Sequence, residues 1–140
     1  MFVIYNFFLS LIIFISPLII LIRIFLGKED QNRFKEKYGF LAKNNNSNEV
    51  VWIHGASVGE ILSIIPIIKK FEKDKKIKRI LITSSTTSSS QILSKFRFKK
   101  TIHQFYPFDL SFLTKHFINH WKPKLAIFVD SEIWPNMFNN

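Results

Sequence analysis

Three acidic side chains stand where catalytic carboxylates are often found, directly after apolar segments that suit strands. Glu60 follows the apolar run Val51–Ile53 and the small residues of GASVG, and it precedes apolar residues at helical spacing. Asp130 and Glu132 lie two residues apart after the apolar run LAIFV. A carboxylate in such a position can accept a proton from a substrate hydroxyl, or stabilise positive charge that develops during a reaction.

Each of these acids also has a structural interpretation. Glu60 would open a helix, where the helix dipole favours a negative charge, and this alone explains an acid there. One acid of the pair Asp130 and Glu132 can cap the helix that follows, which leaves the other without a structural reason. From the residues alone, Glu60 is therefore first a helix-opening acid, and the pair is the better indication of chemistry.

The elements that must position these acids form an alternating pattern of strands and helices. The apolar runs predict four strands, at Val50–His54, Arg79–Thr83, Ile102–Tyr106 and Leu125–Val129. Helical patterns lie between them, at about 58–74, 88–97 and 110–120. Alternation at this spacing predicts βαβ units, and hence an α/β fold with a Rossmann-like parallel sheet.

Four unusual segments follow the four predicted strands. They are GASVGE with Glu60, the hydroxyl-rich run 83–90, YPFD at 106–109 and DSEIWPN at 130–136. Sheets of this type bind ligands beyond the carboxyl ends of their strands. We therefore expect the four segments to meet at one edge of the sheet and to form the functional site there.

The charge and composition limit the classes of partner. The net charge is +10 and the pI is about 10.0, which is typical of proteins that meet nucleic acid, anionic lipid or a phosphorylated substrate. Cysteine is absent from the sequence, which excludes disulfides and cysteine-ligated metal. The cations lack the interleaved aromatic residues of a base-stacking surface, so nucleic acid is not an expected partner.

The composition of the N-terminal region predicts a membrane anchor. Residues 2–22 carry no charged side chain, and as a helix they would be about 30 Å long, the thickness of a bilayer's hydrocarbon core. Cations follow this run and do not precede it, which favours an uncleaved anchor over a signal peptide and places the rest of the chain in the cytoplasm. We expect a single-pass transmembrane helix at 1–22 in the inner membrane, on whose cytoplasmic face the domain lies.

The remaining boundaries follow from composition. Residues 23–43 are basic and amphipathic, which predicts a juxtamembrane helix that either lies near the membrane surface or packs on the domain. A polar linker, KNNNSNE, extends this region to residue 49. The Rossmann-like domain is then expected at 50–140.

Several motifs together resemble a known family. WIHGASVGE, YPFD and SEIWPN, in this order and with the basic KEKYG ahead of them, resemble the N-terminal half of 3-deoxy-D-manno-octulosonic acid (Kdo) transferases. The resemblance covers essentially the whole chain. It implies a membrane-associated glycosyltransferase of the GT-B type, which transfers Kdo from CMP-Kdo to a lipid A precursor. It also implies that neither a metal nor a cofactor takes part.

The resemblance assigns expected roles to individual residues. Glu60 matches the family's general base, and Asp130 matches the acid held to stabilise the transition state, which is Glu in the family. Ser57, Gly59 and Glu132 are then expected to bind the acceptor. Asp is one methylene shorter than Glu, and a displacement of about 1 Å at a catalytic group can cost roughly 10²-fold in rate. The family also has a Gly in the loop that matches 83–90, where this chain has only Ser and Thr.

The resemblance also implies that a second domain is needed for transfer, and an alternative function without transfer stays open. In a GT-B enzyme a second domain, C-terminal to this one, holds the nucleotide sugar, so we expect an acceptor-binding half that works with a donor-binding half, here on a separate chain or lost. The alternative is a non-catalytic, membrane-anchored domain that binds anionic inner-membrane lipids through its basic surface.

Overall fold

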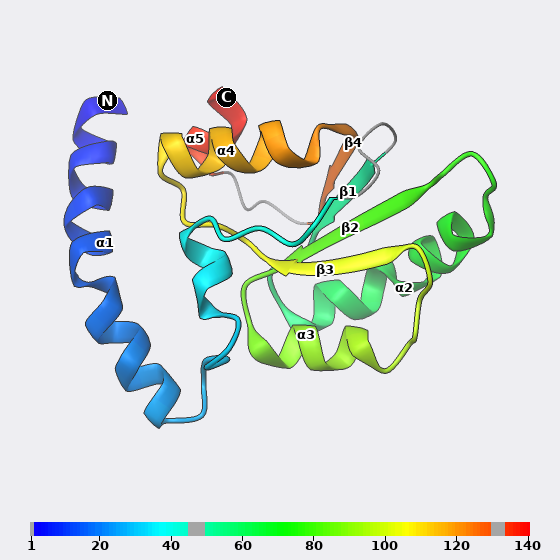
Figure 1. Ribbon diagram of the computed structural model, residues 1–140, viewed down its shortest axis with the longest axis horizontal. Coiled ribbons are helices and arrows are strands. Elements are labelled where there is room, and N and C mark those ends of the chain that lie inside the picture. The colour runs from blue at the N-terminus through cyan, green and yellow to red at the C-terminus, as the bar shows by residue number, and fades with distance from the viewer. Residues whose placement is uncertain (1, 45–49, 130–133) are drawn as a thin grey trace.

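The computed structural model describes residues 2–44, 50–129 and 134–140, and it shows an α/β fold (Figure 1). Its four strands form one parallel sheet in the order β3-β2-β1-β4. The elements are α1 (Phe2–Phe25), the 3-10 helix η1 (Phe34–Tyr38), β1 (Val50–His54), α2 (Val58–Lys73), β2 (Arg79–Ser84), α3 (Thr87–Ser94), β3 (Thr101–Phe105), α4 (Ser111–Trp121), β4 (Pro123–Phe128) and α5 (Pro135–Asn139). The predicted fold class is confirmed, and each predicted strand and helix of the sheet region is present with ends shifted by a few residues.

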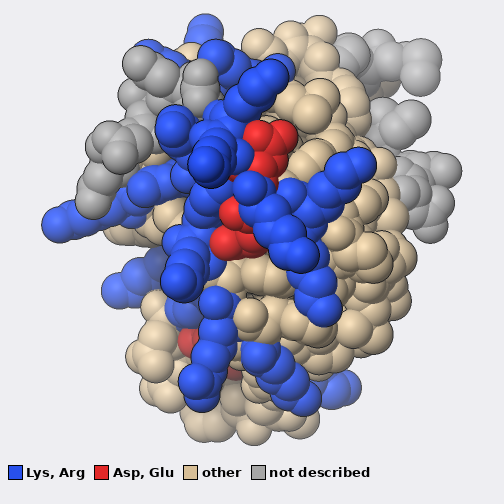
Figure 2. Space-filling model, turned by 90° about the vertical axis from the view of Figure 1, so that its right-hand side faces the viewer, with Lys and Arg blue, Asp and Glu red and all other residues tan. Residues whose placement is uncertain are grey.

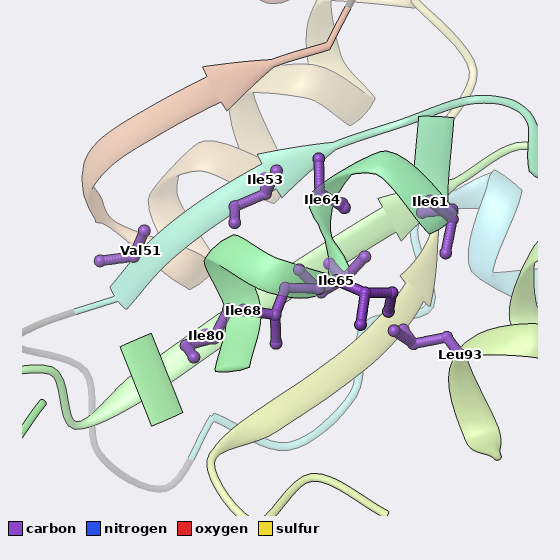
Figure 3. Close-up of a cluster of buried hydrophobic side chains, with 9 residues drawn as sticks. Val51, Ile53, Ile61, Ile64, Ile65, Ile68, Ile80 and Leu93 are labelled. Carbon is purple, nitrogen blue, oxygen red and sulfur yellow. The ribbon is translucent and has the colours of Figure 1, made fainter. Parts of the chain in front are cut away.

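Alternate residues of β1 build two hydrophobic cores, one on each face of the sheet. Val51 and Ile53 pack with Ile61, Ile64, Ile65 and Ile68 of α2, with β2, and with Leu93 of α3 (Figure 3). Val50 and Trp52 pack on the opposite face, in a cluster that includes Phe117 and Trp121 of α4 and Met137 of α5. Helices α2 and α3 therefore cover one face and α4 and α5 the other (Figure 1). Because both faces are covered, the strands read as continuous apolar runs.

The strand order places a topological switch point between β1 and β4. From β1 the chain moves outward through β2 to β3, and it then returns through α4 to β4 on the other side of β1. Backbone bonds continue past the strand ends at the carboxyl edge: Gly55 N–H donates to Thr83 O (3.0 Å) and Val129 N–H donates to His54 O (2.9 Å). The chain therefore leaves β1, β2 and β4 side by side, at the edge where sheets of this type bind ligands.

The segment at 23–43 differs from the continuous helix that its pattern predicts. Helix α1 ends at Phe25, and Gly27 follows with a φ of +66°, a conformation that glycine adopts without strain. The carboxylate of Asp30 then accepts the backbone N–H groups of Asn32 and Arg33 at 2.9 and 3.0 Å, which forms a turn. Only the five residues of η1 are helical after this turn.

Helix η1 is fixed to the free edge of β3 through Arg33 and Glu36. The Glu36 carboxylate accepts the backbone N–H of Phe105 at 2.8 Å, which satisfies a donor on the edge strand. Arg33 donates to Glu36 Oε1 at 2.6 Å and to the His103 carbonyl at 2.9 Å. The basic segment thus packs on the domain, one of the two placements that the sequence left open.

Helix α1 lies alongside the domain, beyond the carboxyl ends of the strands (Figure 1). Its Tyr5 hydroxyl donates to the Asp109 carboxylate at 2.8 Å, and its Ser16 hydroxyl shares a hydrogen bond of 2.6 Å with the Tyr38 hydroxyl. In the described part of the chain, the stretch Val3–Phe25 is the one helix whose length and composition suit a membrane crossing, a property that N-terminal signal sequences share.

Lysine and arginine side chains gather on the face that lies at the amino-terminal ends of the strands (Figure 2). They come from the segments that enter the strands: 69–79 ahead of and at the start of β2, 99–100 ahead of β3, and 122–124 at β4. Glu72 lies among them and accepts the N–H of Lys100 at 2.8 Å. This basic face is at the opposite end of the molecule from α1 (Figure 1).

His103 of β3 links η1 to the middle of the sheet as a neutral ring. Its Nδ1 accepts a hydrogen bond from Arg33 at 3.0 Å, so its Nε2–H donates to the Ser84 hydroxyl at 2.8 Å. Burial of the ring, and then the charge of Arg33, lower the pKa of His103 from 6.5 to about 3. The imidazole therefore stays uncharged at neutral pH, and Arg33 keeps its acceptor.

This pKa shift predicts how stability changes with pH. Between about pH 3 and 6.5 the unfolded chain binds a proton at His103 that the folded chain does not, so the free energy of unfolding falls as the pH is lowered through this range. The slope from this group is at most about 1.4 kcal/mol per pH unit. His103→Gln should show a shallower fall than the parent between pH 6.5 and 5, measured by urea denaturation in detergent.

His116→Gln is the matched control, because this histidine is exposed on α4. It should keep the parent's pH dependence. Equal slopes in the parent and in His103→Gln would show that His103 does not enter the folded state as a neutral ring.

Candidate functional site

Glu60 lies in the first turn of α2, just beyond the carboxyl end of β1. Its Oε2 accepts the backbone N–H of Ala56 at 2.8 Å, and its Oε1 accepts the Ser57 hydroxyl at 2.5 Å. The Ser57 oxygen in turn accepts the backbone N–H of Glu60 at 3.3 Å. These reciprocal bonds closely match the capping box, in which a serine and a glutamate three residues later satisfy free donors at a helix start.

Two glycines shape the turn around Glu60. A Cβ at Gly55 would lie 3.2 Å from Glu60 Cβ and 3.4 Å from Ile61 Cδ1, so glycine lets the end of β1 pass close to the first turn of α2. A Cβ at Gly59 would meet nothing within 4 Å. The backbone at Gly59 therefore faces open space, next to the Glu60 carboxylate.

The Glu60 carboxylate is both oriented and reachable. The side chain is half-buried, and each of its oxygens accepts one hydrogen bond from the described part of the chain, although a carboxylate oxygen can accept more than one. A fixed carboxylate that a substrate hydroxyl can approach meets the geometric requirement for a general base. The cap explains why the acid is stable there, and it leaves acceptor capacity for a substrate.

Most of the described hydroxyls in the run 83–90 have structural roles. The Thr83 hydroxyl accepts the indole N–H of Trp52 at 2.9 Å in the core, and Ser84 bonds His103. Thr86 caps α3 by accepting the backbone N–H of Ser89 at 3.2 Å. Ser85 is different, because its backbone N–H reaches the Ala56 carbonyl at 3.4 Å and its residue lines a cavity at the carboxyl edge.

Asp109 joins the YPFD segment to the WPN segment and to α1. It is 2% exposed, and its carboxylate accepts the N–H groups of Asn136 and Met137 at 2.9 Å each, as well as the Tyr5 hydroxyl. The Asn136 side chain donates to the Asp109 carbonyl and, at 2.7 Å, to Asn6 of α1. Asp109 thus accepts the free N–H groups at the start of α5, and its carboxylate has little capacity left for chemistry.

The carboxyl edge contains a cavity of about 200 Å³ that opens between α1 and the ends of β2 and β3. Its lining consists of Leu9, Lys37, Ser85, Tyr106, Pro107, Phe108, Asp109 and Trp134. Lys37 is 9% exposed and its ammonium donates to both oxygens of Glu29 at 2.8 Å. Ser85 connects this cavity to Ala56, whose N–H holds Glu60, so the cavity adjoins the capped carboxylate.

A larger groove of about 920 Å³ lies between the second half of α1 and η1. Its walls are mainly apolar, with Lys35 as the charged residue among them: Pro17, Ile20, Leu21, Ile24, Phe25, Gln31, Phe34, Lys35 and Tyr38. Its volume and composition suit a hydrocarbon chain more than a polar ligand.

Of the residues expected to form the site, Glu60, Ser57 and Gly59 are brought together in one turn. Asp130 and Glu132 lie outside the described residues. Sequence reasoning did not single out Lys37 or Ser85, and it left Asp109 without a role. The spacing of Ser57 and Glu60 was a readable capping pattern, whereas no local pattern marks Lys37. Within the described residues, no group of three or more His, Cys, Asp or Glu side chains could hold a metal ion.

The chain resembles known proteins over nearly its whole length. The family profile described as 3-deoxy-D-manno-octulosonic-acid transferase (kdotransferase) matches residues 32–140. A 3-deoxy-D-manno-octulosonic acid transferase of Rickettsia bellii is 40% identical over 135 residues, which are 96% of this chain and 32% of the relative. The enzyme of that name from Haemophilus influenzae is 30% identical over 137 residues, 95% of this chain and 32% of the relative.

A probable mitochondrial 3-deoxy-D-manno-octulosonic acid transferase of Arabidopsis thaliana is 31% identical over 137 residues, 96% of this chain and 31% of the relative. The chain thus spans about a third of the length of the curated relatives it matches. The profile match over residues 32–140 and the relatives together show that the chain belongs to the 3-deoxy-D-manno-octulosonic acid transferase family and comprises its N-terminal domain.

Proposed function

We propose that this chain supplies the acceptor-binding half of a glycosyltransferase that moves Kdo from CMP-Kdo to a lipid A precursor, with Glu60 as the general base. The observation that carries the proposal is the oriented and reachable Glu60 carboxylate at the end of β1, next to the switch point between β1 and β4. Ligands bind at such switch points in open α/β sheets.

The proposed step is a displacement at the anomeric carbon of Kdo. An acceptor hydroxyl gives its proton to Glu60, and its oxygen forms the new bond to that carbon. The bond from that carbon to the CMP oxygen breaks, and CMP leaves with the electron pair. The sugar gains oxocarbenium character on the way, which a nearby carboxylate stabilises. Asp130 is proposed for that second role.

The two hydrogen bonds that orient the Glu60 carboxylate contribute to this step. Ala56 N–H and the Ser57 hydroxyl fix the carboxylate before the acceptor arrives, so less freedom is lost when it binds. Ser57, Gly59 and Glu132 are proposed to contact the acceptor sugar. The open space at Gly59 supports a close approach of the sugar to the backbone.

The cavity at the carboxyl edge and the groove between α1 and η1 support a lipid acceptor. The cavity at the carboxyl edge has a polar part at Ser85 and at Lys37, whose ammonium is paired with Glu29, and this part suits a sugar. The groove between α1 and η1 is apolar and suits an acyl chain. One ligand with a polar head and hydrocarbon tails would use both.

The donor is proposed to bind mainly outside these 140 residues. The relatives are about three times as long as the matched region, and the remaining length would hold CMP-Kdo, on the same chain or on a separate one. The domain boundaries expected from sequence, at 1–22, 23–49 and 50–140, remain part of this proposal. The chemistry needs no cofactor.

Attachment to the cytoplasmic side of the inner membrane is proposed to occur through α1. The alternative function, binding of anionic lipid through the basic surface, is less well supported. The basic face lies at the amino-terminal ends of the strands, at the opposite end of the molecule from α1 (Figures 1 and 2). A membrane that takes up α1 therefore does not meet this face.

The cytoplasmic location predicts the result of a reporter fusion. A reporter that is active only outside the cytoplasm, joined after Asn140, should give no activity, because the cations that follow α1 keep the domain inside. A reporter active only in the cytoplasm, at the same position, should give a strong signal. The reverse pattern would contradict the proposed location and the access to a cytoplasmic nucleotide sugar.

The role of Glu60 is tested by Glu60→Gln in a chimera that joins this chain to the remaining two thirds of the Rickettsia bellii relative. The amide keeps the shape of the side chain but accepts no proton, so turnover should fall by about 10²-fold or more. The affinity for the acceptor should change little. Loss of the helix cap should cost no more than about 1–2 kcal/mol of stability, measured by denaturation in detergent.

Asp74→Asn is the matched control, an acid-to-amide change at the other end of α2. It should leave turnover unchanged. If Glu60→Gln transfers Kdo as fast as the parent, Glu60 is only a helix cap and the base lies elsewhere. If Asp130→Glu raises turnover in the same chimera, the short Asp130 side chain limits the rate.

A further inference from the structure

Helix α1 contacts the domain along nearly its entire length. Residues with reduced exposure recur every three or four positions: Tyr5, Leu9, Ile13, Ser16, Ile20 and Ile24. Positions three and four apart share one face of a helix, and this face spans roughly 29 Å between the first and last of them. Helix α1 is therefore laid lengthwise on the domain (Figure 1).

Polar contacts fix α1 at both ends and in the middle. At the first turn, Tyr5 bonds Asp109 at 2.8 Å and Asn6 bonds Asn136 at 2.7 Å. Ser16 bonds Tyr38 at 2.6 Å, and Arg23 pairs with Glu29 at 3.2 Å at the last turn. Asp109, Asn136 and Glu29 are all buried, so these are contacts of a packed element and not of a loose tether.

The opposite side of α1 is apolar and uncovered. Thirteen large hydrophobic residues of α1 are exposed, among them Val3 at 82% and Phe14 at 85%, and two of them, Leu21 and Phe25, line the groove beside η1. A surface of this extent is larger than soluble monomers usually leave in water, so a partner covers it. With no charged side chain from Phe2 to Ile22, hydrocarbon is the environment that suits it.

An upright crossing of the bilayer conflicts with the docked position. If α1 stood across the membrane, its first turn would lie near the far leaflet, and it would take Asp109, α5 and the start of α4 with it. Lys115 of α4 is exposed, and a charge in the hydrocarbon is costly, as is backbone that is not helical. The contacts and the crossing exclude one another.

We propose that α1 lies in the plane of the membrane, with its outward side in one leaflet and its inward side on the domain. A helix with its side chains is about 10–12 Å thick, and interfacial helices sink by about 5–10 Å, well short of a core of about 30 Å. This replaces the single crossing expected from the sequence and does not depend on the role of Glu60.

The orientation has a consequence for the carboxyl edge of the sheet. Helix α1 lies beyond the strand ends, so the loops at that edge face the leaflet that holds α1 (Figure 1). Helix α1 also forms one wall of the groove between α1 and η1. An acyl chain of a lipid can then enter the groove from the leaflet without crossing water.

The absence of cysteine from the sequence makes the orientation measurable. A short polar extension that carries one cysteine is added ahead of Met1 in the full chain, and spheroplasts are treated with a membrane-impermeant maleimide. If α1 lies in the plane of the membrane, both of its ends are cytoplasmic. The added cysteine should then remain unlabelled in intact spheroplasts and become labelled only after lysis. Labelling before lysis would mean that α1 crosses the bilayer, which overturns the proposal.

Two controls and one second measurement complete the test. A cysteine at Lys75→Cys, on the basic face, should be labelled only after lysis in either orientation of α1. A known protein with a cysteine on the outer surface should be labelled without lysis. Asn6→Cys with Asn136→Cys should be joined by a short bis-maleimide in native membranes, whereas Asn6→Cys with Lys75→Cys should not. Failure of the first pair to cross-link, or recovery of the chain from the cytosol as a dimer, would also overturn the proposal.

Discussion

The parallel pairing of β1 with β2 on one side and β4 on the other determines where the remaining elements can lie. Parallel neighbours cannot be joined by a tight turn, so each connection crosses a face of the sheet as a helix. All five residues of β1 are buried as a result, and its alternating side chains form the centre of both cores. The same connections bring the carboxyl ends of all strands to one edge, which places Glu60 next to the loop after β2.

Two acids at that edge differ in their burial and in the number of hydrogen bonds that their carboxylates accept. Asp109 is 2% exposed and accepts three hydrogen bonds on its carboxylate, so it is fully used in joining α5 and α1. Glu60 is half-buried and has two such bonds. Capping would not compete with the proposed proton acceptance at Glu60, because the bonds that complete the helix start also fix the direction of the free lone pairs.

The sequence was informative where structure depends on local periodicity, and less so where it depends on distant partners. The apolar runs and helical spacings located the sheet and its helices because each buries its own repeating face. The segment 23–43 has a helical pattern, but its conformation depends on bonds that Arg33 and Glu36 make with His103 and Phe105, about 70 residues away. Helix α1 is apolar on nearly all sides, so its composition could not show which side packs on the domain.

The hydrogen bond between Asn6 and Asn136 joins residues 130 positions apart, which has a consequence for biosynthesis. At about 5–20 residues per second, a ribosome makes the second partner roughly 6–26 s after the first. During this interval α1 is complete as a helix but has no domain to pack on. A chaperone or the membrane must cover its apolar surface during this time. Helix α1 reaches its final position only when α5, which carries Asn136, has emerged from the ribosome.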